Sequence, residues 1–169
     1  PAILSHIDLR SGEVRAVLGE PGALPHDRPL SVLQTRDGAI WIGHRTGLMR
    51  YDEHSGEFQS FGTSDAIPLP NGYVDQLVDA GDSFWLSAQG GGLQRRGLNG
   101  AVLETITEGE AGLDSVDTEQ LLLTDDMTLW WSGATGLRRR KPGSDAFEKL
   151  AGSPEGRIYG FDLHDEHLW

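Results

Sequence analysis

The stretch DGAIWIGHRTGLMRYD, residues 37–52, is repeated twice further along the chain, as GDSFWLSAQGGGLQRRG (81–97) and DMTLWWSGATGLRRRK (126–141). Each copy contains a tryptophan that follows an apolar residue, and a Gly-Leu pair comes after it. The repeated residues are Trp41, Trp85, Trp130 and the C-terminal Trp169, with Gly47, Gly92 and Gly136 opening the Gly-Leu pairs. Successive tryptophans are 44, 45 and 39 residues apart, which indicates one unit duplicated along the polypeptide.

The length of this unit predicts a four-stranded β-propeller blade. A period of about 40–45 residues is shared by propeller blades and some helical repeats, but no long segment has apolar residues at helical spacing. The 23 glycines and 8 prolines favour short strands joined by tight turns. In the first copy we expect strands at 30–35, 39–43, 47–51 and 57–61, with tight turns at Asp37-Gly38 and Ser55-Gly56. The fold class is therefore all-β, built of antiparallel propeller blades.

The register of the repeat divides the chain into units. The expected units are the last two strands of a blade at 1–18, one blade each at 28–61, 72–106 and 117–150, and the first two strands of a blade at 157–169. Because the chain starts and stops inside a blade, we expect a fragment of a larger propeller with about seven blades. As an alternative, the C-terminal pair of strands closes against the N-terminal pair and completes a four-bladed ring.

Composition excludes several classes of function. The net charge of −12 and the pI near 4.7 argue against binding to nucleic acid or to an anionic membrane surface. The absence of cysteine excludes disulfides, thiolate metal sites and cysteine nucleophiles. No apolar run approaches the roughly 20 residues of a membrane helix, so we expect no membrane insertion of this segment.

The segment LSVLQTRDGAIWIGHRTGLMRYD, residues 30–52, resembles the two-component regulator propeller repeat. Such repeats build the extracytoplasmic sensor regions of bacterial hybrid histidine kinases and diguanylate cyclases. The resemblance is sharpest over 30–61 and weakens later, where Ser87 and Ser132 replace Gly43. It implies a periplasmic, non-catalytic, ligand-sensing segment of a signalling receptor, without a cofactor. Its implied partners are a small molecule or saccharide, the remainder of the receptor chain, and a second copy in a homodimer.

Propeller geometry directs attention to the loops at the axial end of the channel. His44, Arg45 and Gln89 follow the second strand of their blades and are candidate rim contacts for a ligand. A second set, Arg50, Arg95 and Arg139, recurs at one position of the repeat. This set has either a repeated structural role or a role in contacting ligand. The repeated tryptophans and glycines are expected to be structural.

Other motifs have simpler interpretations. His164-Asp165-Glu166-His167 resembles a metal cluster, but it aligns with the turn between the first two strands of a blade and is expected to be a solvated hairpin. Arg138 to Lys141 is a basic run whose side chains alternate between the faces of a strand. Gly90 to Gly92 is a hairpin turn, because no Lys-Ser/Thr pair follows it. We predict no metal site and no catalytic residue.

Two other functions remain open at this stage. The repeat also resembles that of the propeller lyases that open streptogramin antibiotics, in which case His44 or His164 would serve as the general base. Alternatively, the chain is a scaffold propeller that binds a protein partner.

Overall fold

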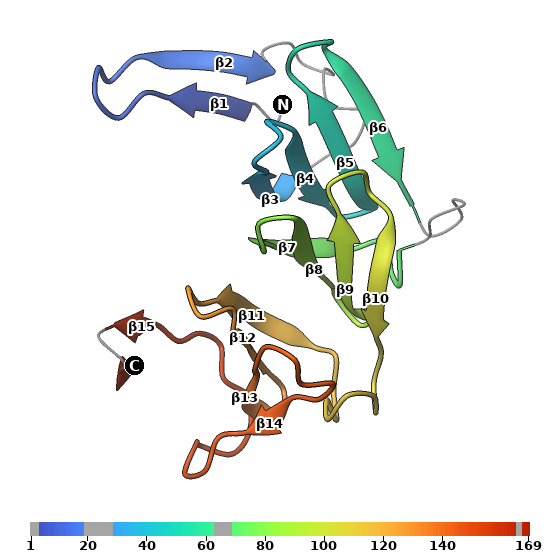
Figure 1. Cartoon of the computed structure of the whole chain (residues 1–169), viewed down its shortest axis with the longest axis vertical. Helices are drawn as coiled ribbons and strands as arrows, with labels where there is room; N and C mark the ends of the chain where they lie inside the picture. Colours follow the sequence, from blue (N-terminus) through green and yellow to red (C-terminus); the bar gives the residue numbers. More distant parts are fainter. Residues whose placement is uncertain (1–3, 19–28, 63–68, 165–166) are drawn as a thin grey trace.

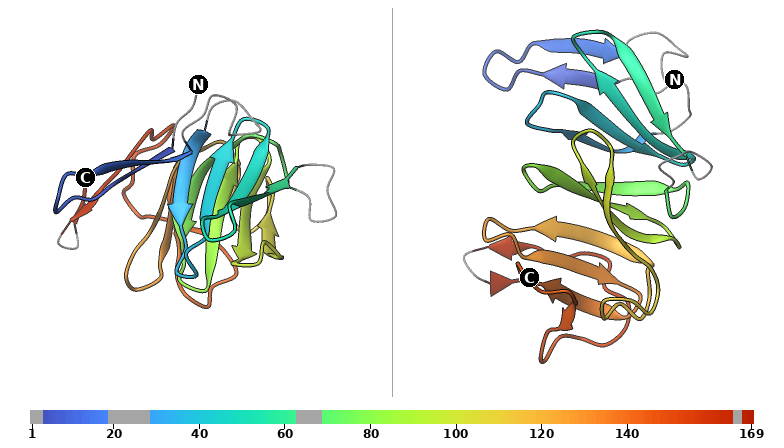
Figure 2. Two further views of the ribbon diagram at one scale, coloured as in Figure 1. Left: turned by 90° about the horizontal axis from the view of Figure 1, so that it is seen from above. Right: turned by 45° about the vertical axis from the view of Figure 1, so that its right-hand side comes forward.

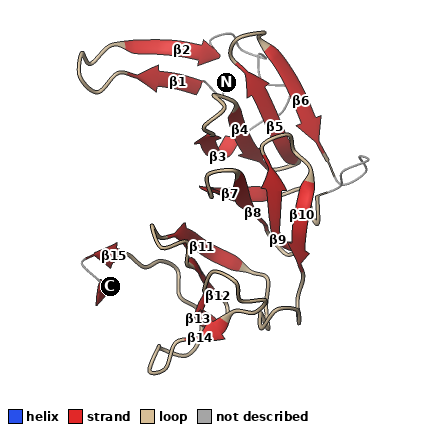
Figure 3. Ribbon diagram, in the orientation of Figure 1, coloured by secondary structure: helices blue, strands red, loops and turns tan. Residues whose placement is uncertain are grey.

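The computed structural model describes residues 4–18, 29–62, 69–164 and 167–169. Within these ranges the chain consists of β-strands and turns, without a helix (Figure 3). It therefore offers no helix that is long and apolar enough to cross a bilayer in the part that is described. The prediction of an all-β chain is confirmed.

Three four-stranded antiparallel sheets follow one another along the chain, with a two-stranded hairpin at each end. The N-terminal hairpin consists of β1 (Leu4–Ile7) and β2 (Val14–Leu18). Blade 1 consists of β3 (Pro29–Gln34), β4 (Ile40–His44), β5 (Gly47–Asp52) and β6 (Glu57–Phe61). Blade 2 consists of β7 (Val74–Asp79), β8 (Ser83–Ala88), β9 (Gly92–Gly97) and β10 (Val102–Ile106). Blade 3 consists of β11 (Thr118–Leu123), β12 (Leu129–Gly133), β13 (Gly136–Arg140) and β14 (Glu148–Lys149), and the C-terminal hairpin of β15 (Leu163–His164) and β16 (His167–Leu168).

The sheets are arranged as propeller blades. Within each sheet the strands pair in chain order, and the sheets fan around an arc with β3, β7 and β11 on its concave side (Figure 1). The innermost strand β7 contacts both β3 and β11, so the three blades meet along their inner edges. The strands expected in the first copy of the repeat agree with β3 to β6 to within one residue at each end.

The closed four-bladed ring is not formed. Strands β1 and β2 pair only with each other, and β15 and β16 do the same. The two hairpins lie at opposite ends of the arc, as Figure 1 and the right view of Figure 2 show. The alternative in which these two hairpins share one blade is therefore not the arrangement in this structure.

Each repeated tryptophan within a blade packs against the next blade. Trp41 is fully buried and contacts Phe84 and Leu86 of blade 2, with 4.6 Å between the ring centroids of Trp41 and Phe84. Trp85 packs in the same way in a cluster with Leu129 and Trp131 of blade 3. Because side chains alternate along a strand, the neighbours of each tryptophan point to the opposite face and contact the preceding blade. The duplicated unit therefore produces one apolar layer between each pair of blades.

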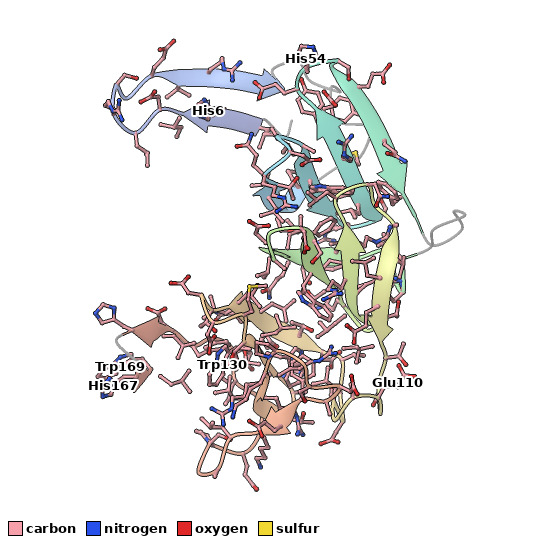
Figure 4. All side chains as sticks on the ribbon, in the orientation of Figure 1. His6, His54, Glu110, Trp130, His167 and Trp169 are labelled. Atoms are coloured by element: carbon pink, nitrogen blue, oxygen red, sulfur yellow. The ribbon has the colours of Figure 1, made fainter. Side chains whose placement is uncertain are left out.

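The last two tryptophans of the repeat differ in their surroundings. Trp130 packs on Phe161 of the C-terminal segment, with ring centroids 6.4 Å apart. Trp169 forms backbone hydrogen bonds with Asp162 in both directions, which continues the β15–β16 ladder. Its side chain, however, is 79% exposed and lies at the end of the arc (Figure 4). Trp169 thus keeps the ladder position of the repeat without the packing of the other three.

The Gly-Leu pairs have a steric explanation. A Cβ atom on Gly92 would lie 2.1 Å from the carbonyl oxygen of Ile106, and one on Gly47 would lie 2.5 Å from that of Phe61. In blades 1 and 2 the third strand can therefore begin beside the fourth only if its first residue lacks a side chain. The leucine that follows, Leu48 or Leu93, is fully buried between blades.

Candidate functional site

The first group of candidate residues lies at the turns between the second and third strands. His44 ends β4 with 2% of its surface exposed, and its Nδ1 accepts a hydrogen bond from the backbone N–H of Thr46 at 3.3 Å. The guanidinium of Arg45 lies 5.8 Å from the ring centroid of Tyr73. The backbone N–H of Gln89 donates to the carbonyl oxygen of Tyr73 at 2.9 Å. These contacts tie the turns of blades 1 and 2 to the segment that precedes β7.

The second group lies nearer the other end of the strands. In the antiparallel ladders Arg50 is paired with Trp41, Arg95 with Trp85, and Arg139 with Trp130. The tryptophan is the second or third residue of its strand and is close to the turn that follows the innermost strand. The structure therefore does not bring the six candidate residues into one site.

A cavity lies beside one of these Trp-Arg pairs, between blades 2 and 3. Its volume is about 240 Å³. Its apolar lining consists of Ala80, Trp85, Leu123, Met127, Leu129 and Pro142. Its polar and charged lining includes Asp82, Ser83, Arg95, Glu104, Arg140, Lys141 and Ser144. An aromatic wall, several cations and two hydroxyl groups thus converge on one cavity, which has the general character of a small-molecule site.

Most of the charges in this cavity are compensated by neighbours. Arg140 forms an ion pair with Glu104, with 2.7 Å between Nη1 and Oε1, and its guanidinium lies 5.7 Å from the ring centroid of Trp85. Lys141 is 3.7 Å from a carboxylate oxygen of Glu148. Arg95 is different, because its buried Nε has no hydrogen-bond partner and its guanidinium takes part in none of the ion pairs found among the described residues. Arg95 is therefore the cation of the cavity that can engage a ligand without losing an internal partner.

A second, larger cavity of about 940 Å³ lies between blade 3 and the C-terminal hairpin. It is lined by Trp130, Arg139, Leu163 and Leu168, among others. Arg139 donates from Nε to Oε1 of Glu148 at 2.8 Å, and this bond holds the pKa of the Glu148 carboxyl below its usual range. The repeated arginine of blade 3 is thus already neutralised.

At the interface between blades 1 and 2, Arg96 stands at the repeat position that Arg140 has in blade 3. Arg96 is fully buried, lies 5.3 Å from the ring centroid of Phe61, and donates to Gln94 and to the carbonyl oxygen of Gly100. Burial lowers the pKa of Arg96 to about 10. A Cβ atom on Gly100 would lie 2.7 Å from Phe61, so this turn is pressed against blade 1. The repeated arginine at this interface, Arg50, has Asp37 at 3.5 Å as its ion-pair partner.

Arg50, Arg95 and Arg139 occupy the same position of the repeat, but their ion-pair partners differ in the structure. Blade 2 has Gly81 at the place of Asp37, and its Glu104, which lies opposite Arg95 as Glu148 lies opposite Arg139, forms its ion pair with Arg140 instead. Register alone does not reveal this difference, because it depends on which arginine the Glu104 carboxylate pairs with. The cavity itself, which depends on how two blades meet, has no signal in the sequence.

The motif at 164–167 lies only partly within the described residues. His164 and His167 are paired across the β15–β16 hairpin, whereas Asp165 and Glu166 lie outside the described residues. Among the residues that are described, no three or more His, Asp or Glu side chains are grouped as metal ligands. The basic run is ion-paired, since Arg138 bonds Asp114, Arg139 bonds Glu148 and Arg140 bonds Glu104.

Comparison with solved structures shows the fold. The extracellular domain of a B. thetaiotaomicron two-component system protein superposes on 96% of this chain, with a TM-score of 0.72 and 16% sequence identity. A chain of the mitotic checkpoint complex matches 98% of this chain (TM-score 0.71, 14% identity), and YCF48 from Cyanidioschyzon merolae matches 91% (TM-score 0.61, 15% identity). The chain spans 22% of the length of the bacterial domain and 50% and 52% of the other two. No protein-family model and no curated protein matches the sequence. The chain therefore has a propeller fold, shared with extracellular sensor domains and with propellers of other kinds.

Proposed function

We propose that this chain is the ligand-sensing part of a periplasmic receptor of the two-component type, and that it binds a small molecule or saccharide without transforming it. The fold agrees with that of extracellular domains of two-component system proteins over nearly the whole chain. The repeat sequence over 30–52 supports the same proposal independently of the fold.

One observation carries the binding role, namely the cavity between blades 2 and 3. It is lined by the indole of Trp85 and by the guanidinium of Arg95, which has no ion-pair partner among the described residues. The equivalent arginines of the other two blades are ion-paired. Arg95 is half-buried, so an anionic ligand in the cavity can pair with its guanidinium without displacing an internal ion-pair partner.

The proposal is tested by a thermal-shift screen of this chain against saccharides and small metabolites. A ligand that binds only the folded state raises the unfolding midpoint with its concentration, by about 2.7 kcal/mol of stability at one hundred times Kd. We expect at least one saturable stabilising ligand. A complete screen without one, together with a positive streptogramin-lyase assay or the capture of a purified protein partner, would replace the sensor proposal by one of its rivals.

The lyase alternative has little support in the geometry. His44 is buried, and its Nδ1 is engaged by Thr46. A general base must reach the proton of a bound substrate. The substitution His44→Ala in the lyase assay tests this directly, because an enzyme that uses His44 would lose its activity.

Apolar side chains at the two ends of the arc suit contact with the remainder of the receptor. Leu9 is 95% exposed in the N-terminal hairpin, and Trp169 is 79% exposed at the C-terminal one. We propose that both are covered in the whole receptor. Hydrogen exchange of the β1–β2 and β15–β16 amides should then be slower in the receptor than in this chain, and equal rates would contradict the contact.

A further inference from the structure

We infer that the cavity between blades 2 and 3 binds a small organic monocarboxylate, with Arg95 as the group that recognises its charge. The inference deepens the proposed binding function and rests on it. It adds the location of the site, the charge of the ligand and its size.

The charge of the ligand follows from the groups around Arg95. Three cations, Arg95, Arg140 and Lys141, and two carboxylates, Asp82 and Glu104, line the cavity. Glu104 is paired with Arg140 at 2.7 Å. Lys141 faces Glu148, whose pKa is held down chiefly by Arg139. A single cation is left without a partner, so one negative charge on the ligand suffices, and the two carboxylates would repel a second.

The chemical group follows from the donor. A guanidinium presents parallel N–H donors that match the two oxygens of a carboxylate. The Nε of Arg95 is covered by protein, so the terminal N–H groups of this cavity-lining side chain are the donors left for the ligand. The hydroxyls of Ser83 and Ser144 line the same cavity but donate to Asp82 and to the carbonyl oxygen of Ala146, so they offer a ligand acceptors only.

The size and the apolar part of the ligand follow from the remaining wall. The volume of about 240 Å³ exceeds the roughly 150 Å³ of an engineered apolar cavity that accepts benzene. Trp85, Leu123 and Leu129 provide apolar surface opposite the charged groups. A ring with one carboxylate therefore suits the cavity better than a bare inorganic anion, which would leave the apolar wall uncovered.

The experiment uses benzoate as the probe and measures its binding to the 169-residue chain by isothermal titration calorimetry. We expect saturable binding that is at least about tenfold tighter than that of uncharged benzyl alcohol, because a hydrogen bond to a charged group contributes about that factor. Arg95→Gln should weaken benzoate binding by at least about tenfold. Arg95→Lys keeps the positive charge but loses the two parallel N–H donors of the guanidinium, so it should give an intermediate affinity.

The matched control is Arg139→Gln, which removes the equivalent arginine of blade 3 and should leave benzoate binding within about twofold. Circular dichroism checks that each variant is folded. If Arg95→Gln does not fold, the comparison of benzoate with benzyl alcohol and the Arg95→Lys variant decide the question.

The inference is overturned if benzoate shows no saturable binding, if benzyl alcohol binds as tightly, or if Arg95→Gln and Arg139→Gln weaken binding equally. These outcomes leave the proposed function standing when the ligand screen finds another ligand whose affinity is insensitive to Arg95. If the screen also finds nothing, both fail.

Discussion

The interface between blades 1 and 2 contains a fully buried arginine, whereas the interface between blades 2 and 3 contains a cavity lined by the corresponding arginine. At the first, Arg96 and the turn at Gly100 cover Trp41 and Phe61. At the second, the corresponding Arg140 leans across Trp85 toward Glu104, and the space beside Arg95 stays open. The arginine at this repeat position therefore packs between the blades at the first interface, and at the second it borders a cavity in which a ligand can bind.

The inner edges of these two interfaces differ as well. On the inner strands, Ser31 of β3 corresponds to Gln76 of β7, because each is paired with the second residue after the tryptophan of its blade, Gly43 and Ser87 respectively. Gln76 donates to the carbonyl oxygen of Glu119 and accepts from the N–H of Leu121 at 2.7 Å, so it clamps the exposed edge of β11. Ser31 is too short to do this, and its buried Oγ has no partner among the described residues. One interface relies on close packing, and the other on a side-chain amide that pairs with the next backbone.

The largest expected effect concerns the tryptophans that pack these interfaces. Trp41→Ala should cost about 3–5 kcal/mol of unfolding free energy, because Trp41 is fully buried. Trp85→Ala should cost less, since Trp85 borders a cavity that already reduces its contacts. Trp169→Ala is the matched control and should change stability by less than about 0.5 kcal/mol, because its side chain is 79% exposed.

Urea unfolding followed by far-UV circular dichroism measures all three variants on one scale, independently of the lost fluorophore. Equal losses of unfolding free energy for Trp41→Ala and Trp85→Ala would show that the interface between blades 1 and 2 and the interface between blades 2 and 3 do not differ in packing energy.

A smaller effect is expected where blade 1 approaches the inner strand of blade 2. Gly43 occupies the place of Ser87, and a Cβ atom there would lie 2.7 Å from the carbonyl oxygen of Val74 and 2.5 Å from Oγ of Ser31. Gly43→Ser, although it copies the next blade, should therefore destabilise by about 1–3 kcal/mol through overpacking. Thermal unfolding of Gly43→Ser and Gly43→Ala measures the loss. A stability equal to that of the wild type would mean that the blades can separate at no cost.

The sequence predicted the fold well because the fold depends on a local unit. Period, turn residues and alternation along strands are all read within about 45 residues, and they placed β3 to β6 correctly. The exposure of Trp169 was not foreseen, because alignment reports the position of a residue and not whether a neighbouring blade covers it.

The candidate site could be predicted only in part. Arg95 was selected as one of a repeated set, yet its distinction from Arg50 and Arg139 depends on carboxylates placed by turns and edge strands. His44, by contrast, has a role in its own turn that a rim position does not suggest. Side-chain partners across blades arise from the angle between sheets, and no spacing in the sequence encodes that angle directly.

The amide clamp gives the third prediction. Gln76→Leu removes both hydrogen bonds to β11 and leaves the N–H of Leu121 without its acceptor, which should cost about 1–2 kcal/mol. Ser31→Ala, at the corresponding position of blade 1, should be nearly neutral because the Ser31 hydroxyl has no partner to lose. Hydrogen exchange at the Leu121 amide should increase in Gln76→Leu alone. Equal costs for the two variants would show that the clamp does not distinguish the interfaces.

The smallest effect is a pH dependence that only the interface between blades 2 and 3 should show. Asp75 lies at the irregularity of β7, where blade 1 has the apolar Leu30. Burial raises the pKa of the Asp75 carboxyl and the nearby Glu119 adds to the rise, while the hydrogen bond that Ser87 donates opposes it.

Because the folded state favours the neutral form of Asp75, the folded chain holds this proton at a pH where the unfolded chain has released it. Stability from Asp75 is therefore full below the ordinary aspartate pKa and is lost as the pH rises through the raised value. The side chain introduced by Asp75→Asn stays neutral and can still accept a hydrogen bond from Ser87. The unfolding temperature of Asp75→Asn should therefore rise relative to that of the wild type as the pH increases from about 4 to 7. A difference between Asp75→Asn and wild type that stays constant with pH would show that burial at β7 does not hold the proton, and that the two interfaces differ in packing alone.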